Sequence, residues 1–257
     1  MEIAEILFLA LVGLALGSFL NVTIDRLPRG ESLIRPPSRC DACHHRLGLL
    51  DLVPIVSYVW LLGRCRYCDY RIPYRSPLVE AVTAVGCAFI GYQYGLTPVS
   101  AVLVLYLTTI IHLVLVELEH SLILNSVIVT ALVIVLATLP FSPLGHNLGL
   151  GETYLHSLAG AGAGICIMLL IYPLSKGRIG AGKVKLAALL GAMLGFPHII
   201  AGLAVGLVGV GLLAAALLVL KSRGHSDAIP LGPMLLGGAA SVLVTGTGIY
   251  NWYLGLF

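Results

Sequence analysis

Residues 98–116 read PVSAVLVLYLTTIIHLVLV, a stretch without a single Asp, Glu, Lys or Arg. A helix of about 20 apolar residues is long enough to cross the roughly 30 Å hydrocarbon core of a bilayer. Over all 257 residues the chain is 58% hydrophobic and only 11% charged, whereas soluble domains are about 25% charged. The sequence therefore predicts an all-α polytopic membrane protein. Soluble α/β enzymes and disordered tails are excluded, and a net charge of +3 gives no reason to expect nucleic-acid binding.

Apolar runs of spanning length recur along the rest of the chain and indicate about eight transmembrane helices. The sixth and seventh runs are divided only by Phe196, Pro197 and His198, so one bent hairpin is an alternative to two separate helices. The expected spans are residues 4–24, 77–94, 98–117, 122–140, 153–175, 183–197, 199–220 and 231–254.

All 15 Lys and Arg residues fall in three places. Nine lie within residues 26–75, four within 176–185, and two at positions 221 and 223. Cytoplasmic loops carry an excess of Lys and Arg. Eight spans that start from an external N-terminus place all three segments on the cytoplasmic side, and the sequence therefore predicts that both termini are external. The first run follows acidic Glu2 and Glu5 and has no small-residue cleavage site, so we expect it to be a retained helix.

Four of the six cysteines form two C-x2-C pairs: Cys40 with Cys43, and Cys65 with Cys68. Two such pairs can supply four thiolates to one tetrahedral zinc ion, and a closed coordination sphere indicates a structural rather than a catalytic metal. Disulfides are the alternative, but they are rare in the reducing cytoplasm. We call residues 25–76 the four-cysteine segment, and we expect zinc to supply much of its order because so short a segment builds little core.

Two further groups of residues have simple structural interpretations. His44 and His45 lie beside the first cysteine pair and are expected to be exposed rather than to replace a thiolate. Cys87 and Cys166 lie within spans and are expected to be small buried hydrophobes. The run GAGAG at residues 160–164 lies within a span and follows no strand, so it predicts close helix packing rather than a nucleotide loop.

Motifs along most of the chain resemble the bacterial type IV prepilin leader peptidases, a family of polytopic membrane aspartyl proteases that also methylate the new N-terminus of the pilin. The resemblance runs from about residue 14 to 235, and its elements are specific as a combination. They are GSFLNV at 17–22, RLPRGES at 26–32, the two cysteine pairs, PIVSY at 54–58, GRCRYC at 63–68, RSPLVE at 75–80, LEH at 118–120, residues 180–190 and IPLGP at 229–233.

The family's two catalytic aspartates are both replaced in this chain. The first belongs to a D-x5-I-P-[DN] pattern, whose position is taken by Glu117, and Leu124 stands where that pattern has proline. The second is the D of G-x-G-D-x-K, whose position is taken by Lys183. An aspartyl protease needs two carboxylates that share a proton, so the resemblance predicts lost or impaired proteolysis. Glu80, Glu119 and Asp227 are the carboxylates available as a replacement acid, and Glu80 is the best placed of them. A Glu117–Lys183 ion pair is expected if the two side chains face each other.

The resemblance also implies the remaining assignments. Residues 1–24 form a first helix, residues 25–76 a cytoplasmic zinc-binding segment associated with methyl transfer, and residues 77–257 a seven-helix peptidase-like domain. The implied cofactors are zinc and S-adenosylmethionine, with Gly63 as a candidate cofactor-binding residue. The implied partners are prepilin or pseudopilin leader segments and the lipid bilayer of the bacterial inner membrane, and a homo-oligomer is possible. Whether the chain is an active enzyme stays open, and a zinc-stabilised structural, substrate-binding or transport protein without catalysis is the alternative.

Overall fold

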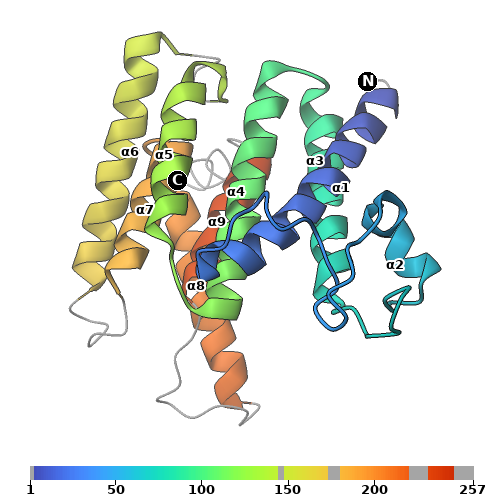
Figure 1. Cartoon of the computed structure of the whole chain (residues 1–257). Helices are drawn as coiled ribbons and strands as arrows, with labels where there is room; N and C mark the ends of the chain where they lie inside the picture. Colours follow the sequence, from blue (N-terminus) through green and yellow to red (C-terminus); the bar gives the residue numbers. More distant parts are fainter. Residues whose placement is uncertain (1–2, 144–147, 173–179, 220–230, 246–257) are drawn as a thin grey trace. The chain divides into compact units, whose positions relative to one another are not determined.

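The computed structural model describes residues 3–143, 148–172, 180–219 and 231–245. Within these ranges the chain is helical, apart from loops and two isolated β-bridges, and this confirms the predicted all-α fold. The helices in Figure 1 are α1 (Ile3–Arg26), α2 (Val56–Trp60), α3 (Arg75–Tyr94), α4 (Pro98–His120), α5 (Asn125–Thr138), α6 (Leu150–Ile171), α7 (Ala181–Leu194), α8 (His198–Val219) and α9 (Leu231–Thr245). Short 3-10 turns lie at Leu27–Arg29, Leu49–Leu52 and Leu139–Phe141.

Each of the eight predicted spans overlaps one of these helices, and residues 173–175, 220 and 246–254 of those spans lie outside the described residues. Three stretches are long and apolar enough to cross a membrane by length and composition, namely Ile3–Arg29, Pro98–His120 and Leu150–Ile171. The predicted sixth and seventh spans are two separate helices, α7 and α8. Gly195 ends α7 with a φ of +69°, a left-handed conformation that glycine adopts at no steric cost.

Two compact units make up the chain, residues Met1–His112 and Leu113–Phe257. In the first unit α1 packs along α3 (Figure 1), and the contact depends on two glycines of α1. A Cβ atom on Gly13 would lie 2.7 Å from Cα of Ala84, and one on Gly17 would lie 2.6 Å from Cα of Glu80. The spacing of four residues on both helices puts both contacts on one face. Close backbone approach of this kind is how helices associate in lipid.

In the second unit α7 lies at the centre, in contact with α5, α6, α8 and α9. Its residues from Leu189 to Leu194 are all buried, as expected of a helix that is apolar on every side. Gly160 and Gly164 of α6 face the backbone of Gly191 and Ala187 so closely that neither position has room for a Cβ atom. The predicted role of the GAGAG run in close helix packing is therefore confirmed.

The α6–α7 contact generates a stability prediction with a matched control in the same glycine run. Gly164→Leu places a side chain against the Ala187 backbone, whereas no atom lies within 4 Å of a Cβ atom on Gly162. We expect Gly164→Leu to destabilise the protein by about 1–3 kcal/mol, as overpacking of a close contact typically does. Gly162→Leu should leave stability nearly unchanged. Thermal unfolding in detergent tests this, and equal effects of the two substitutions would contradict the close contact.

Candidate functional site

The two cysteine pairs of the four-cysteine segment fold into hairpin turns with the same hydrogen bonds. In each, the N–H of the first cysteine donates to the carbonyl five residues on, from Cys40 to His45 at 3.0 Å and from Cys65 to Tyr70 at 2.8 Å. The residue after the second cysteine is left-handed in both, with φ of +55° at His44 and +56° at Asp69. This geometry turns both thiols of a pair toward the same point.

The two turns also share flanking arginines, which form an internal repeat. Isolated antiparallel bridges join Arg39 to Arg46 and Arg64 to Arg71, one residue before the first cysteine and three after the second. The signal is present in the sequence as R-C-x2-C-x2-R, which occurs twice. The segment is therefore a pair of equivalent knuckles, each closed at its base by a backbone bridge between two arginines.

The four sulfur atoms of the knuckles form one cluster. All lie within 4.8 Å of one another, and Sγ of Cys40 is 3.8 Å from Sγ of Cys68. Zn–S bonds of about 2.3 Å in a tetrahedron place sulfurs about 3.8 Å apart. The cysteines are free rather than disulfide-bonded. The donor set and its spacing therefore suit a metal ion, and a structural zinc is consistent with them.

The pKa values of two of these thiols are shifted in opposite directions by their surroundings. Burial raises the pKa of Cys40, but hydrogen bonds from the backbone of Cys43 and Ala42 outweigh burial, and the pKa is lowered to about 7. The backbone N–H of Tyr70 lowers the pKa of Cys68, whereas burial and the neighbouring thiols raise it to about 12. Four thiolates this close repel one another unless a cation lies between them.

Asp51 connects the 3-10 turn at Leu49–Leu52 to the second knuckle. Its carboxylate accepts hydrogen bonds from Nε of Arg66 at 2.8 Å, from the N–H of Gly48 at 3.0 Å and from the hydroxyl of Tyr67 at 3.3 Å. Burial raises the pKa of Asp51, but the Gly48 N–H and the Arg66 guanidinium outweigh it, so the pKa is lowered. The Tyr67 ring in turn lies 3.8 Å from that of His45 in the first knuckle.

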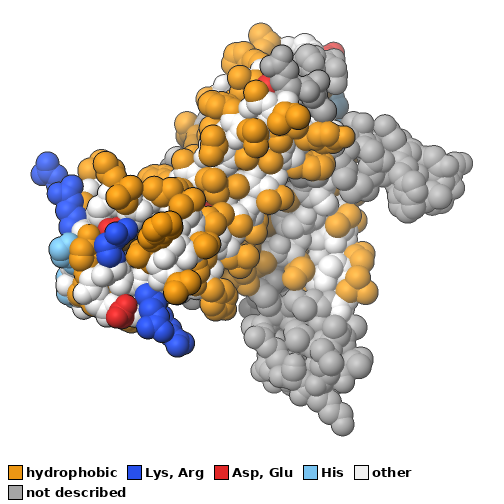
Figure 2. Space-filling view, turned by 90° about the vertical axis from the view of Figure 1, so that its right-hand side faces the viewer, with side chains coloured by type: hydrophobic (Ala, Val, Ile, Leu, Met, Phe, Trp, Pro, Cys, Tyr) orange, Lys and Arg blue, Asp and Glu red, His pale blue; other side chains and the backbone are white. Residues whose placement is uncertain are grey.

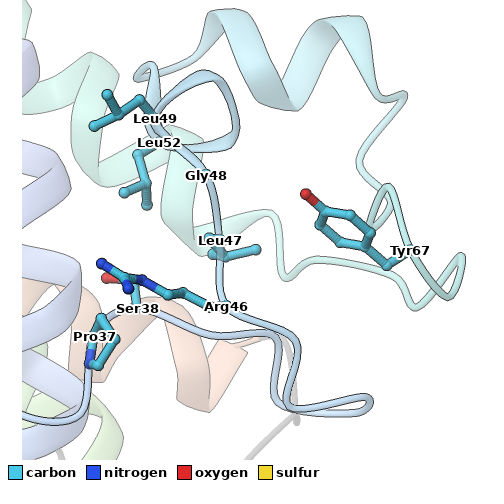
Figure 3. Close-up of a pocket in the computed structure, with 8 residues that line it drawn as sticks. All are labelled: Pro37, Ser38, Arg46, Leu47, Gly48, Leu49, Leu52 and Tyr67. Carbon is cyan, nitrogen blue, oxygen red and sulfur yellow. The ribbon is translucent and has the colours of Figure 1, made fainter.

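A pocket of about 340 Å³ opens beside these contacts. Figure 3 shows Arg46 and Pro37 on one side and Tyr67 on the other. Its walls are Pro37, Ser38, Arg46, Leu47, Gly48, Leu49, Leu52 and Tyr67. Gly63, the predicted cofactor-binding residue, is not part of this wall. It follows α2 with a φ of +70°, and a Cβ atom there would lie 2.9 Å from the Tyr58 hydroxyl, which is a sufficient structural reason for glycine.

The four-cysteine segment begins and ends at two polar contacts between α1 and α3. Arg75 forms a bidentate ion pair with Asp25, at 2.9 Å and 2.8 Å, and Nδ2 of Asn21 donates to the carbonyl of Ser76 at 3.0 Å. Further along α3, Oε2 of the buried Glu80 accepts a hydrogen bond from the N–H of Ile55 at 2.7 Å. Glu80 therefore has a structural partner, and its role as a replacement acid stays a prediction.

In the second unit Lys183 does face Glu117, with 4.0 Å between Nζ and Oε1. The Glu117 side chain is 8% exposed and that of Lys183 is 18% exposed. The backbone N–H of Gly232 donates to Oε1 of Glu117 at 3.2 Å. One carboxylate oxygen is thus held by an amide and lies near an ammonium group, while Oε2 is buried without a hydrogen-bond partner among the described residues.

Three other residues near this pair make contacts that the motif patterns alone did not predict. A Cβ atom on Gly232 would overlap the Glu117 carboxylate, so glycine is required where α9 meets that side chain. Nζ of Lys185 donates to Oδ1 of Asn125 at 2.9 Å. This bond joins the last position of the first motif to the last position of the second. All three residues lie in family motifs, Gly232 in IPLGP at 229–233. Those motifs were the sequence signal from which the three contacts could have been suspected.

The outcomes for the remaining candidate residues are mixed. His44 and His45 are exposed, as predicted. Cys87 is fully buried, also as predicted, but the expectation for Cys166 is wrong. Cys166 is exposed because it lies on an outward face of α6, two residues from the buried contact position Gly164. The basic residues at positions 176, 178, 221 and 223 lie outside the described residues, so their predicted part in the topology is not described here.

Comparisons with known proteins identify relatives of this chain. The family model of the bacterial peptidase A24 N-terminal domain matches residues 11–94. A prepilin leader peptidase/N-methyltransferase of Aeromonas salmonicida is 32% identical over 277 aligned positions, covering 95% of this chain and 92% of the relative. Proteins with the same name from Bacillus subtilis and Pseudomonas aeruginosa are 29% and 28% identical and cover 96% and 98% of this chain, and 96% and 94% of their own lengths. No solved structure gives a significant match.

The fold and the cysteine cluster define a class of protein: a polytopic helical membrane protein with a metal-type thiol site in the loop after its first helix. The likeness to the curated relatives extends over nearly the whole of both chains. The chain belongs to the prepilin leader peptidase/N-methyltransferase family.

The cysteine cluster generates a prediction for metal content. Cys65→Ser removes one of the four thiolates. A closed tetrahedral site needs all four ligands, so we expect the loss of one to abolish metal binding. We expect the purified protein to contain about one zinc per chain, as a four-thiolate site binds one ion, and the Cys65→Ser variant to contain none. Cys166→Ser is the matched control and should retain the metal. Elemental analysis of protein purified without added metal checks this, and zinc in the Cys65→Ser variant would contradict it.

Proposed function

We propose that this chain is a member of the family that binds prepilin or pseudopilin leader segments but has lost proteolysis or retains it only weakly. One observation carries the proposal: Nζ of Lys183 lies 4.0 Å from Oε1 of Glu117, at the two positions where the family pattern has aspartates. Other motif positions are kept, including Gly180, Gly182 and Asn125, although Leu124 stands where the first pattern has proline. The site thus keeps glycine and asparagine positions of the family motifs, but has a glutamate and a lysine where the family has two aspartates.

The replaced charges are incompatible with aspartyl protease chemistry. In that reaction one carboxylate takes a proton from water while its partner, protonated, donates to the substrate carbonyl. Lysine provides no carboxylate, so the site has no second acid with which Glu117 could share a proton. Glutamate also carries its carboxylate about 1 Å further from the backbone, and a misplacement of that size can lower a rate about 100-fold.

Lysine is also unusual at this place in the helix. Lys183 lies in the first turn of α7, which begins at Ala181. The N-terminus of a helix carries a partial positive charge that favours aspartate and disfavours lysine. The Glu117 carboxylate offsets this effect, so the pair is consistent as a structural ion pair. An aspartate at position 183 would interact favourably with the partial positive charge at the N-terminus of α7.

The wider assignments of the proposal follow from family membership. Zinc held by Cys40, Cys43, Cys65 and Cys68 orders the four-cysteine segment, and this segment faces the cytoplasm of a bacterial inner membrane. Its excess of arginine over acidic residues supports that side. The external location of both termini, and the division into a segment at 25–76 and a peptidase-like domain from 77, belong to the same proposal.

The peptidase part of the proposal predicts a gain of activity. The Glu117→Asp, Lys183→Asp double variant should cleave a prepilin-like peptide, whereas the unaltered protein should bind the same peptide and leave it intact. Lys183→Asp alone should reach about 1% of the double variant's rate, because its first carboxylate remains misplaced. The measurement is mass spectrometry of the peptide after incubation with purified protein in detergent, together with crosslinking of the uncut peptide.

Cleavage by the unaltered chain would overturn this part of the proposal. Glu80→Gln is then the variant to assay, because loss of cleavage in it would identify Glu80 as the replacement acid. Failure of the unaltered chain to crosslink the peptide would remove the leader-binding part while leaving the loss of proteolysis in place.

We further propose that the pocket beside the knuckles holds S-adenosylmethionine. The residues that line the pocket suit that molecule. The Arg46 guanidinium can bind a carboxylate, and the Tyr67 ring can stack on an adenine or contact a sulfonium. Its volume of about 340 Å³ is within the range of small-molecule sites. The bound cofactor would supply the methyl group, while Arg46 and Tyr67 hold and orient it. The family's second activity does not require the replaced aspartates.

The internal repeat offers a matched control for this cofactor site. Arg46 and Arg71 occupy the same place in the two knuckles, but only Arg46 borders the pocket. We expect Arg46→Ala to weaken S-adenosylmethionine binding about tenfold or more, the effect of losing a hydrogen bond to a charged group. Arg71→Ala should leave the affinity unchanged. Calorimetry on the zinc-loaded protein measures both, and an equal loss in the two variants would argue against this pocket.

A further inference from the structure

Helix α2 and the turn that follows it carry large apolar side chains with almost no cover. Trp60 is 80% exposed and Leu62 is 86% exposed, and Val56 and Val59 are also exposed. The side chain of Tyr58 lies on another side, against Gly63. A small hydrophilic segment in water rarely keeps such a group of apolar residues uncovered unless it binds something.

A hydrogen bond fixes the start of α2 at one position along the length of α1 and α3. The N–H of Ile55, the residue before α2, donates to Oε2 of Glu80. Glu80 in turn lies beside Gly17 of α1, in backbone contact. Figure 1 shows α2 beside the end of α3 from which the four-cysteine segment emerges.

The contact between Glu80 and Ile55 lies beside the apolar run of α1, not beyond its end. The apolar run of α1 extends to about residue 24, seven residues beyond Gly17. At 1.5 Å of rise per residue, the Glu80–Ile55 contact is about 10 Å inside the end of that run. Helices that lie in the membrane interface bury their apolar faces about 5–10 Å into the boundary between headgroups and acyl chains. The depth of α2 therefore matches an interfacial position.

The chemistry around α2 also matches the membrane interface. Tryptophan is enriched there because one part of the ring is apolar and the N–H is polar. Arg64 follows α2 and is joined by a backbone bridge to Arg71, and both arginines are exposed. Guanidinium groups bind phosphate oxygens well. Figure 2 shows that blue Lys and Arg side chains gather in one region of the face in view and have hydrophobic side chains among them.

We propose that residues 56–62 form an interfacial anchor that lies in the headgroup region of the phospholipid bilayer and holds the four-cysteine segment against the membrane. Val56, Val59, Trp60 and Leu62 enter the boundary with the acyl chains, and Arg64 contacts lipid phosphate. Glu80 positions the anchor through Ile55, whose φ of +59° is a positive value that a β-branched residue rarely adopts. The carboxylate thus stabilises a strained turn that directs α2 to this depth.

Trp60 provides the test, because the chain has only two tryptophans. The full chain with Trp252→Phe is placed in lipid nanodiscs that contain phosphatidylglycerol. Tryptophan fluorescence is then measured with lipids brominated near the headgroup end of the acyl chain, and with acrylamide in the water. We expect an emission that is blue-shifted relative to the denatured protein, strong quenching by the brominated lipid and weak quenching by acrylamide.

Two other results would overturn the proposal. Strong quenching by acrylamide without an effect of brominated lipid would place Trp60 in water. Protection from both quenchers, dependent on the number of chains per disc, would mean that a second copy covers α2 instead of lipid.

Substitutions in the anchor give a second readout. Val59→Lys together with Leu62→Lys should lower the quenching by brominated lipid about twofold or more, since both changes oppose burial in the interface. Ile34→Lys, at an equally exposed apolar residue of the same segment outside the anchor, should leave it unchanged. Retained zinc in each variant shows that the knuckles are folded, and unchanged quenching in a zinc-bound double variant would contradict the anchor.

Discussion

Close backbone contact at glycine is the interaction on which the helical part of this protein depends. In lipid, apolar side chains gain little by facing one another rather than acyl chains, so helix pairs need contacts that lipid cannot supply. Gly13 and Gly17 provide them for α1 with α3 in the first unit. Gly160 and Gly164 provide them for α6 with α7 in the second, and Gly206 does so for α8 with α9. Two of the candidate site residues are placed by these pairs, because Glu80 lies against Gly17 and Lys183 lies on α7.

The four-cysteine segment depends on a different kind of constraint. It has little apolar interior of its own, and its largest apolar side chains are exposed. Order comes instead from two equivalent knuckles whose sulfurs converge, from the Asp51 contacts to Arg66 and Tyr67, and from the Asp25–Arg75 ion pair at its base. These interactions are polar, or could involve a metal ion at the four thiols, so the order of the segment does not depend on a large hydrophobic core.

The Glu117–Lys183 pair is held by contacts from three elements of the second unit. Gly232 leaves room for a carboxylate and donates to it, and Lys185 binds Asn125 across the two motifs. None of these contacts requires two acids. A buried charge is costly unless an opposite charge or hydrogen bonds accompany it, and Lys183 with the Gly232 amide supplies both to Glu117. The pair is thus compatible with a stable fold in which the shared proton of an aspartyl protease has no place.

The sequence by itself determined the membrane class, the helix positions and the four metal-type ligands, because these depend on local properties: apolar run length, charge and C-x2-C spacing. It also predicted a role for Glu117 and Lys183, through their place in family motifs, and that role stays a prediction. It did not determine that their side chains meet, that Gly232 lies under the Glu117 carboxylate, or that Glu80 binds Ile55, since each contact joins residues far apart in the chain. The exposure of Cys166 and of α2 was decided in the same way. Which face of an apolar helix is covered depends on the partners that pack against it, and only the tertiary structure supplies those partners.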